Sequence, residues 1–277
     1  MASPELTSAR APRVVRARRL ARRSFRATER RFLAEGPQAV REAVAVPGVL
    51  AELFATVEAA ERHPELVQAA SAAGASVHLV ADEVMASLSQ TVTPQGLVGV
   101  CAFLDRPLAE VVAAAPALVA VLAHVRDPGN AGTVLRAADA AGADAVIVTD
   151  ASVDVYNGKC VRASAGSLFH LPVVVGVEVE TAVSQLRAAG SRVLAADGVG
   201  PADLDSELDH SRLATPTAWI FGNEAWGLPE ETRSLADAVV RVPIYGGAES
   251  LNLATAAAVC LYASARQQRG PGGCRQA

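Results

Sequence analysis

This chain of 277 residues contains almost no lysine and no closely spaced cysteines. Lys159 is the single lysine, and the four cysteines show no paired spacing: Cys101, Cys160, Cys260 and Cys274. Such a pattern favours neither a zinc site nor a disulfide framework. Reduced thiols are therefore the expectation, and with them a cytoplasmic location.

Long apolar runs are also lacking. The longest, residues 111–123, has 13 residues and contains Pro116, whereas a membrane-spanning helix needs about 20. No short apolar segment follows the N-terminus, so we expect no secretory signal peptide and no membrane partner.

The common nucleotide and metal motifs are absent as well. The sequence contains no GxGxxG, no phosphate-loop GxxxxGK[ST] and no HExxH, and its five histidines are scattered. These absences argue against a dinucleotide site or a phosphate-loop site. No metal ion is expected.

Charge is distributed unevenly, although the total is only −4. Residues 1–35 hold ten arginines against three glutamates, and the rest of the chain is acidic. Arginine suits phosphate by its charge and its planar donor fork, so we expect residues 1–31 to form a basic, flexible arm that contacts RNA. Its candidate contacts are Arg22, Arg23, Arg26 and Arg30. A solvated tail and an organelle transit peptide stay open as alternatives.

Residues 32–104 alternate helix-like and strand-like stretches, which indicates a small α/β domain. We expect helices at 36–45 and 64–73, and strands at 49–57, 76–80 and 97–103. The last strand follows the turn Thr93-Pro94-Gln95-Gly96, in which proline and glycine supply unusual backbone angles. An alanine-rich stretch, 105–116, is expected to be a linker to a second domain.

Residues 117–277 alternate strand and helix more cleanly, which predicts a mainly parallel sheet covered by helices. The predicted strands are 118–124, 145–148, 171–175, 192–196, 218–221 and 239–242. The predicted helices are one that begins near Asp127 or Asn130 and stops at Gly142, one around 184–189, and a long one at 251–266. Ligands of such sheets bind at the loops that follow the carboxyl ends of strands.

Three of these loops are polar and contain glycine between apolar flanks. They span residues 127–132 with Arg136 beyond them, residues 221–227, and residues 242–252. Glycine at a strand end lets a ligand approach the backbone closely. Each loop also has a plain structural explanation, since Asn130 or Ser250 could cap a helix and Glu224 could begin one.

Together the three loops resemble the motifs of the SpoU or TrmH type of RNA ribose methyltransferase, within the SPOUT superfamily. Residues 130–136 resemble its first motif (Asn-x-Gly-x-x-x-Arg), residues 222–227 its second, and Val242-Pro243 with Ser250-Leu251-Asn252 its third. Their order and intervals agree with the family. Residues 162–166 are also similar to it, and residues 32–104 resemble the ribosomal-protein-like substrate domain that many members carry.

The resemblance implies a C-terminal α/β methyltransferase domain with a trefoil knot, a homodimer, and S-adenosylmethionine as the cofactor. It implies methylation of a ribose 2'-hydroxyl in RNA, with 23S rRNA as the expected substrate. Carried over to this sequence, the cofactor contacts are Gly222, Val242, Leu251, Ala196, Asn223 and Ile244. The residues around the reacting ribose are Asn130, Arg136, Glu224, Ser250 and Asn252, and Arg162 joins the RNA contacts.

The chemistry fits these residue types. Because the methyl group of the cofactor is already activated, the enzyme has to align the hydroxyl and help remove its proton. The family commonly assigns the proton to the counterpart of Arg136, but a guanidinium with a pKa above about 12 is a poor base. Glu224 or water is the alternative, with Arg136 holding ribose or phosphate.

Two other functions stay open. One is a tRNA enzyme of the same family, and the other is a non-catalytic RNA-binding protein of ribosome assembly. A non-catalytic relative should have lost residues of the motifs, and all of them are present, so catalysis is favoured. The last predicted helix repeats Leu253, Ala257, Leu261 and Ala265 at helical spacing, and we expect this face to form the dimer.

Overall fold

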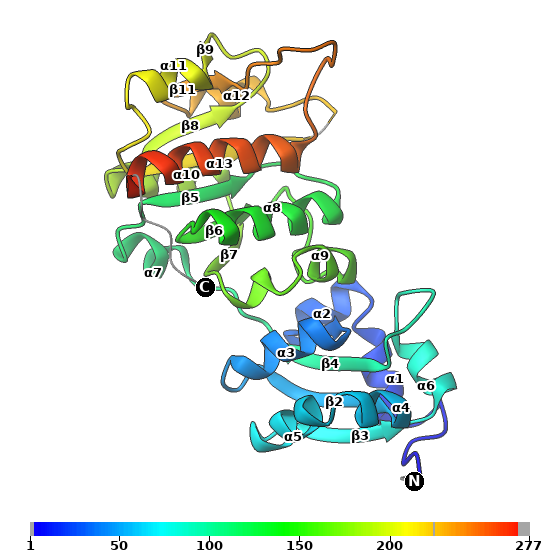
Figure 1. The fold of residues 1–277 in the computed structure, drawn as a ribbon. Helices are drawn as coiled ribbons and strands as arrows, with labels where there is room; N and C mark the ends of the chain where they lie inside the picture. The colour runs from blue at the N-terminus through cyan, green and yellow to red at the C-terminus, as the bar shows by residue number, and fades with distance from the viewer. Residues whose placement is uncertain (1–2, 224, 271–277) are drawn as a thin grey trace. The chain divides into compact units, whose positions relative to one another are not determined.

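The computed structural model describes residues 3–223 and 225–270, and its contacts divide the chain into two compact units (Figure 1). The first unit comprises residues up to 104 together with 154–170, and the second comprises 105–153 together with the chain from 171 onward. The assignment of 154–170 to the first unit is a feature that the sequence did not predict.

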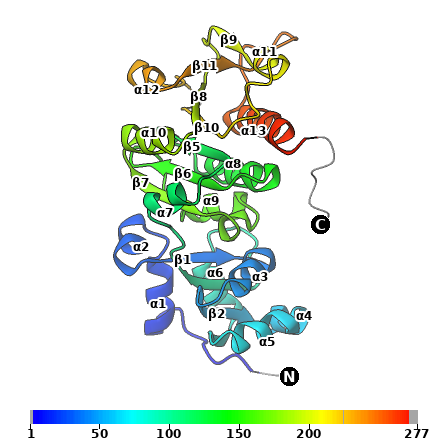
Figure 2. The same ribbon diagram turned by 90° about the vertical axis from the view of Figure 1, so that its left-hand side faces the viewer.

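Among the described residues of the first unit, a four-stranded mixed sheet has the order β1-β4-β2-β3. Its strands are β1 (Arg31–Glu35), β2 (Leu50–Thr56), β3 (Ser76–Val80) and β4 (Leu97–Ala102). Its helices are α1 (Pro12–Arg19), α2 (Arg23–Glu29), α3 (Pro37–Ala45), α4 (Val57–Arg62), α5 (Pro64–Ala72), α6 (Asp82–Leu88) and α9 (Gly158–Ala163), with a 3₁₀ turn at Ser167–Phe169. Figure 2 shows α1 on one side of this sheet and α3, α4 and α5 on the other. The small α/β domain predicted from the sequence is therefore present.

The expected flexible arm is wrong for residues 12–29, which form α1 and α2. Val14, Ala17 and Leu20 are buried and pack in one cluster with residues of α6 and of the sheet. They recur at intervals of three residues and so share one helix face, while arginines occupy the other face. Three apolar residues within an arginine run are enough to dock a short helix on a core.

Residues 154–170 attach to the first unit through an aromatic cluster. The Tyr156 ring stacks on Phe103 with centroids 3.8 Å apart and lies 4.9 Å from the Phe32 ring. The backbone N–H of Leu104 donates to the Tyr156 hydroxyl oxygen at 2.8 Å. Since Phe32 is fully buried, these contacts belong to the core of the unit.

In the second unit, the described residues form a seven-stranded sheet in the order β7-β6-β5-β10-β8-β11-β9, with all neighbouring strands parallel. The strands are β5 (Leu118–Leu122), β6 (Ala145–Thr149), β7 (Val173–Val177), β8 (Arg192–Ala196), β9 (Ala202–Asp203), β10 (Thr217–Phe221) and β11 (Ala238–Arg241). The predicted mainly parallel sheet is confirmed, and the knot stays a prediction of the resemblance.

Helices cover both faces of this sheet (Figure 2). They are α7 (Leu108–Ala113), α8 (Pro128–Ala141), α10 (Val179–Ala188), α11 (Leu204–Asp209), α12 (Glu230–Ser234) and α13 (Leu253–Arg269). The expected linker at 105–116 is wrong, because Leu108 and Val111 of α7 pack into the core of this unit. Successive side chains of β10 point to opposite faces of the sheet. Ile220 packs on the face covered by α10, whereas the Trp219 Nε1–H, on the other face, donates to Ser264 Oγ of α13 at 2.8 Å.

Glycine ends α8 as predicted. Gly142 follows the helix in the left-handed conformation, with φ 69°. At the start of α8 the side chain of Asp127 accepts a hydrogen bond from the Asn130 N–H at 2.9 Å, so Asp127 is the cap. Along residues 3–223 and 225–270, none of the helices combines the length and the apolar character that crossing a bilayer would require.

Candidate active site

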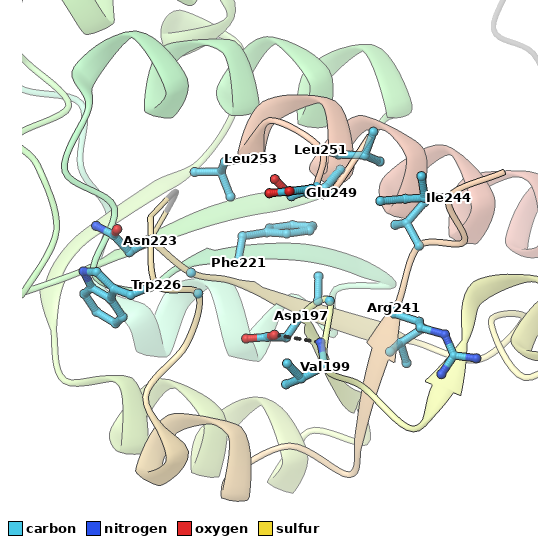
Figure 3. Close-up of a pocket in the computed structure, with 18 of the residues that line it drawn as sticks. Asp197, Val199, Phe221, Asn223, Trp226, Arg241, Ile244, Glu249, Leu251 and Leu253 are labelled. Carbon is cyan, nitrogen blue, oxygen red and sulfur yellow. Dashed lines mark hydrogen bonds between the residues drawn. The ribbon is translucent and has the colours of Figure 1, made fainter. Parts of the chain in front are cut away.

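A cavity of about 540 Å³ lies in the second unit where the carboxyl ends of β8, β10 and β11 meet the start of α13 (Figure 3). All six predicted cofactor residues line it: Ala196, Gly222, Asn223, Val242, Ile244 and Leu251. Ser250 lines it as well. Loops that are far apart in the sequence thus meet at the edge of the sheet where parallel folds bind ligands.

The loop after β10 forms one wall of the cavity and is held in a tight reverse turn. The Asn223 N–H donates to the Gly227 carbonyl at 2.8 Å, and the Gly227 N–H donates back to the Asn223 carbonyl at 3.0 Å. A Cβ on Gly222 would lie 2.5 Å from the Gly227 carbonyl oxygen, and Gly227 itself has φ +71°. The turn therefore requires glycine at both positions, and at these positions it exposes backbone without a side chain to the cavity.

Asp197, directly after β8, was missed by the sequence reasoning. Its side chain is 8% exposed and accepts hydrogen bonds from the backbone N–H groups of Val199 at 3.1 Å and Leu228 at 3.0 Å. The Arg233 guanidinium lies 3.8 Å from it. The carboxylate thus ties the loop after β8 to the loop after β10. A lone aspartate between a strand and Gly198 was the available signal.

Asn252 caps α13 and connects it to the first turn of α8. Its Oδ1 accepts from the N–H groups of Ala254 at 2.9 Å and Thr255 at 3.4 Å, which makes Asn252 the cap in place of Ser250. Its Nδ2 donates to Asn130 Oδ1 at 3.1 Å. Two predicted site residues from opposite ends of the domain sequence are therefore in direct contact, beside the lining residue Leu251.

Three predicted residues do not line the cavity, within the part of the chain that the structure describes: Asn130, Arg136 and Asn252. Asn130 and Asn252 contact each other, whereas Arg136 lies farther along α8 with an exposed side chain. Glu224 lies outside the described residues.

The predicted RNA contact is wrong for Arg26, which is 2% exposed. Its Nε and Nη2 donate to Asp154 Oδ2 at 2.9 and 2.6 Å, and its Nη1 donates to the carbonyls of Leu20 and Ala21, each at 2.8 Å. This arginine joins α2 to the 154–170 segment, and its buried guanidinium is not accessible to RNA.

The other predicted RNA-binding arginines differ in exposure. Arg22 and Arg23 are exposed at the start of α2. Arg30 is exposed, and its guanidinium carbon lies 4.6 Å from the centre of the Phe103 ring. Arg162 is partly buried, with Nη1 3.5 Å from Glu35 Oε2. Arg22, Arg23 and Arg30 thus keep the accessibility that a phosphate contact needs.

Comparisons with known proteins agree with this geometry. The model of the SpoU rRNA methylase family matches residues 117–262, and that of the MRM3-like substrate-binding domain matches residues 11–99. The 23S rRNA (guanosine(2553)-2'-O)-methyltransferase RlmP of Bacillus subtilis is 33% identical over 93% of this chain and 98% of its own length.

Solved structures are similar across both units. The AdoMet-bound rRNA methyltransferase from Sinorhizobium meliloti has a TM-score of 0.82 and 32% identity, covering 95% of this chain and 97% of that one. The SpoU methyltransferase AviRb from Streptomyces viridochromogenes, in complex with AdoMet, has a TM-score of 0.80 and 30% identity, covering 94% and 98%. Two motif loops line one cavity, and the first motif is connected to them through the contact between Asn130 and Asn252. With this arrangement and relatives that span nearly the whole sequence, the chain belongs to the SpoU rRNA methylase family.

Proposed function

We propose that this protein transfers a methyl group from S-adenosylmethionine to a ribose 2'-hydroxyl of 23S rRNA. The observation that carries the proposal is the meeting of two motif loops, residues 221–227 and 242–251, around one cavity, with the first motif joined to them by the contact between Asn130 and Asn252. The names of the similar proteins, which are rRNA methyltransferases, support the substrate class.

The cavity fits the cofactor in size and in chemistry. Its volume of about 540 Å³ lies within the range of small-molecule sites. Apolar side chains of Val242, Ile244 and Leu251 suit an adenine ring, and the bare turn at Gly222 offers backbone groups for hydrogen bonds. When bound, S-adenosylmethionine supplies a methyl group on a positively charged sulfur, ready for transfer.

The residues of the chain then have to position the ribose. The amides of Asn130 and Asn252 fix each other and can orient the sugar, while Ser250 stands exposed at the cavity. A guanidinium is a poor base, so Arg136 suits a phosphate or sugar oxygen better than it suits the proton. Water or Glu224 is left as the proton acceptor.

We also propose that the protein works as a homodimer, through a face that differs from the one the sequence suggested. Leu253, Ala257, Leu261 and Ala265 are buried in the core of their own protomer. The outer side of α13 instead exposes Val259 by 39% and Tyr262 by 53%. These two side chains are the apolar contacts that α13 offers to a second copy. Light scattering at micromolar concentration tests this, and a mass near 28.5 kDa would contradict it.

One experiment tests the function directly. Purified protein is incubated with labelled S-adenosylmethionine and, separately, with 23S rRNA and with bulk tRNA, and ribose methylation is mapped by mass spectrometry. We expect transfer to a 2'-hydroxyl of 23S rRNA. Transfer to tRNA alone would assign the protein to tRNA, and RNA binding without transfer would assign it to a non-catalytic role.

A further inference from the structure

An aromatic pair stands at one end of the cavity. The Trp226 side chain lines the cavity and is 52% exposed. Its ring centre lies 5.6 Å from that of His124, with the two planes at 56°. Figure 3 shows Trp226 together with Asn223 at one end of the cavity, with Ile244 and Arg241 at the other.

The backbone around both rings is held in place. Asn223 Nδ2 donates to the His124 carbonyl at 3.2 Å, and Asn223 Oδ1 accepts from the Ala225 N–H at 2.9 Å. His124 has φ 61°, in the left-handed region that non-glycine residues occupy uncommonly, asparagine, aspartate and histidine more often than the others. Together with the reverse turn between Asn223 and Gly227, these contacts hold the backbone of the loop that carries the exposed indole.

The aromatic pair is connected along the chain to the residues proposed to position the ribose. His124 follows β5, and the same loop leads through the exposed Arg126 to Asn130, which contacts Asn252. A cationic side chain on the loop that carries one ring of an exposed aromatic pair suits an unstacked nucleotide, with the phosphate on the cation and the base on the aromatic face.

We propose that Trp226 is a stacking platform for an unpaired base of the RNA substrate, at or next to the nucleotide whose ribose is methylated. The proposal rests on the proposed function. A ribose can reach a cavity at a sheet edge only if its nucleotide leaves the helical stack, and an indole face replaces part of the stacking energy that the nucleotide gives up. Stacking is tolerant of sequence, so this contact holds the base without reading it.

Fluorescence isolates the contact from catalysis. The chain has two tryptophans, and Trp219 is fully buried, so the Trp219→Phe variant reports on Trp226 alone. We expect a single-stranded RNA oligonucleotide to quench this emission, and the Trp226→Phe variant, which keeps only Trp219, to show no such change. An unchanged emission of Trp219→Phe at saturating RNA would overturn the proposal.

Kinetics of methyl transfer distinguish stacking from a plain apolar contact. Trp226→Ala should raise the KM for RNA about 5- to 100-fold, a larger factor than any change in kcat or in the affinity for S-adenosylmethionine. Trp226→Tyr should restore most of the affinity for RNA and Trp226→Leu little of it. Full rescue by leucine, or a changed molecular mass of Trp226→Ala in light scattering, would refute stacking and assign the side chain to a general apolar contact or to a subunit contact. A wild-type protein that quenches with RNA but transfers no methyl group would refute the proposed function and leave the platform standing.

Discussion

Asn252 donates a hydrogen bond from Nδ2 to Oδ1 of Asn130, and the 3.1 Å contact joins the N-cap of α13 to the first turn of α8. The same Asn252 side chain uses its oxygen to cap α13. One amide therefore performs a structural task with its oxygen and a task at the candidate site with its nitrogen, and the two can be separated by mutation.

Asn252→Asp separates them, because a carboxylate still accepts from the N–H groups of Ala254 and Thr255 but cannot donate to Asn130. We expect the free energy of unfolding to stay within about 0.5 kcal/mol of wild type, whereas Asn252→Ala loses about 1 kcal/mol as a missing cap. Methyl transfer should fall about 10-fold or more in both variants. Wild-type transfer by Asn252→Asp would show that the contact with Asn130 is dispensable.

Arg136→Ala should leave folding nearly unchanged, because the side chain is exposed on α8. Single-turnover methyl transfer should fall about 100-fold or more, the scale of a positioned polar group in catalysis. The matched control is Arg106→Ala, another exposed arginine of the same unit, whose side chain faces Glu110 at 3.6 Å. Full activity of Arg136→Ala would remove this residue from the site, and an Arg136→Lys variant as inactive as alanine would indicate that the planar fork matters.

Gly222→Ala should weaken binding of S-adenosylmethionine at least about 10-fold, a cost of about 1.4 kcal/mol or more. The added Cβ would lie 2.5 Å from the Gly227 carbonyl oxygen and force the cavity wall to shift. Gly246→Ala is the control, since its Cβ would meet nothing within 4 Å. Calorimetric titration measures both, and equal affinities of the two variants would refute the requirement for glycine.

Arginines of α2 should divide into structural and RNA-binding residues. Arg26→Ala leaves Asp154 without its buried partner and should cost about 3 kcal/mol of stability. Arg23→Ala should cost less than about 0.5 kcal/mol. It should lower the slope of log affinity for RNA against log salt by about 1, the change expected when one phosphate is no longer neutralised. A thermal melt and a salt titration decide this, and an unchanged slope for Arg23→Ala would make that side chain merely solvated.

Glu207 should make stability depend on pH in the acid range. Burial alone raises the pKa of this carboxyl, but hydrogen bonds and charge from Arg192 and Arg212 outweigh it, so its pKa lies below the ordinary 4.5. A lowered folded pKa means that the carboxylate stabilises the fold fully above the ordinary value, and that this contribution is lost as the pH falls through the folded value. Glu207→Gln should cost about 1 to 2 kcal/mol at pH 7 and approach wild type at acid pH. A constant difference across the range would contradict this.

Much of the second unit could be predicted because its signals are local. The strand Arg192–Ala196 was predicted at its observed bounds, and α8 stops at Gly142 for the expected reason. The cavity could be anticipated since parallel strands bring their carboxyl ends to one edge.

The rest depends on contacts that a local pattern does not contain. The ion pair of Arg26 with Asp154 spans the first unit, and without it residues 1–31 looked like a free arm. The prediction of which apolar face of α13 is exposed is wrong for a related reason. The stripe through Leu253 and Leu261 is its inner face, and only the fold shows which apolar stripe a core has covered.

The 154–170 segment has a consequence for synthesis. The N-terminal unit leaves the ribosome first, yet Tyr156 and Asp154, which complete its aromatic cluster and pair with Arg26, come after β5 and β6 of the second unit. The first unit therefore cannot finish folding as an early, independent intermediate. A nascent chain stalled before residue 154 should hold Phe32 without Tyr156 and Arg26 without Asp154, so maturation of the N-terminal unit waits for the methyltransferase unit to be partly made.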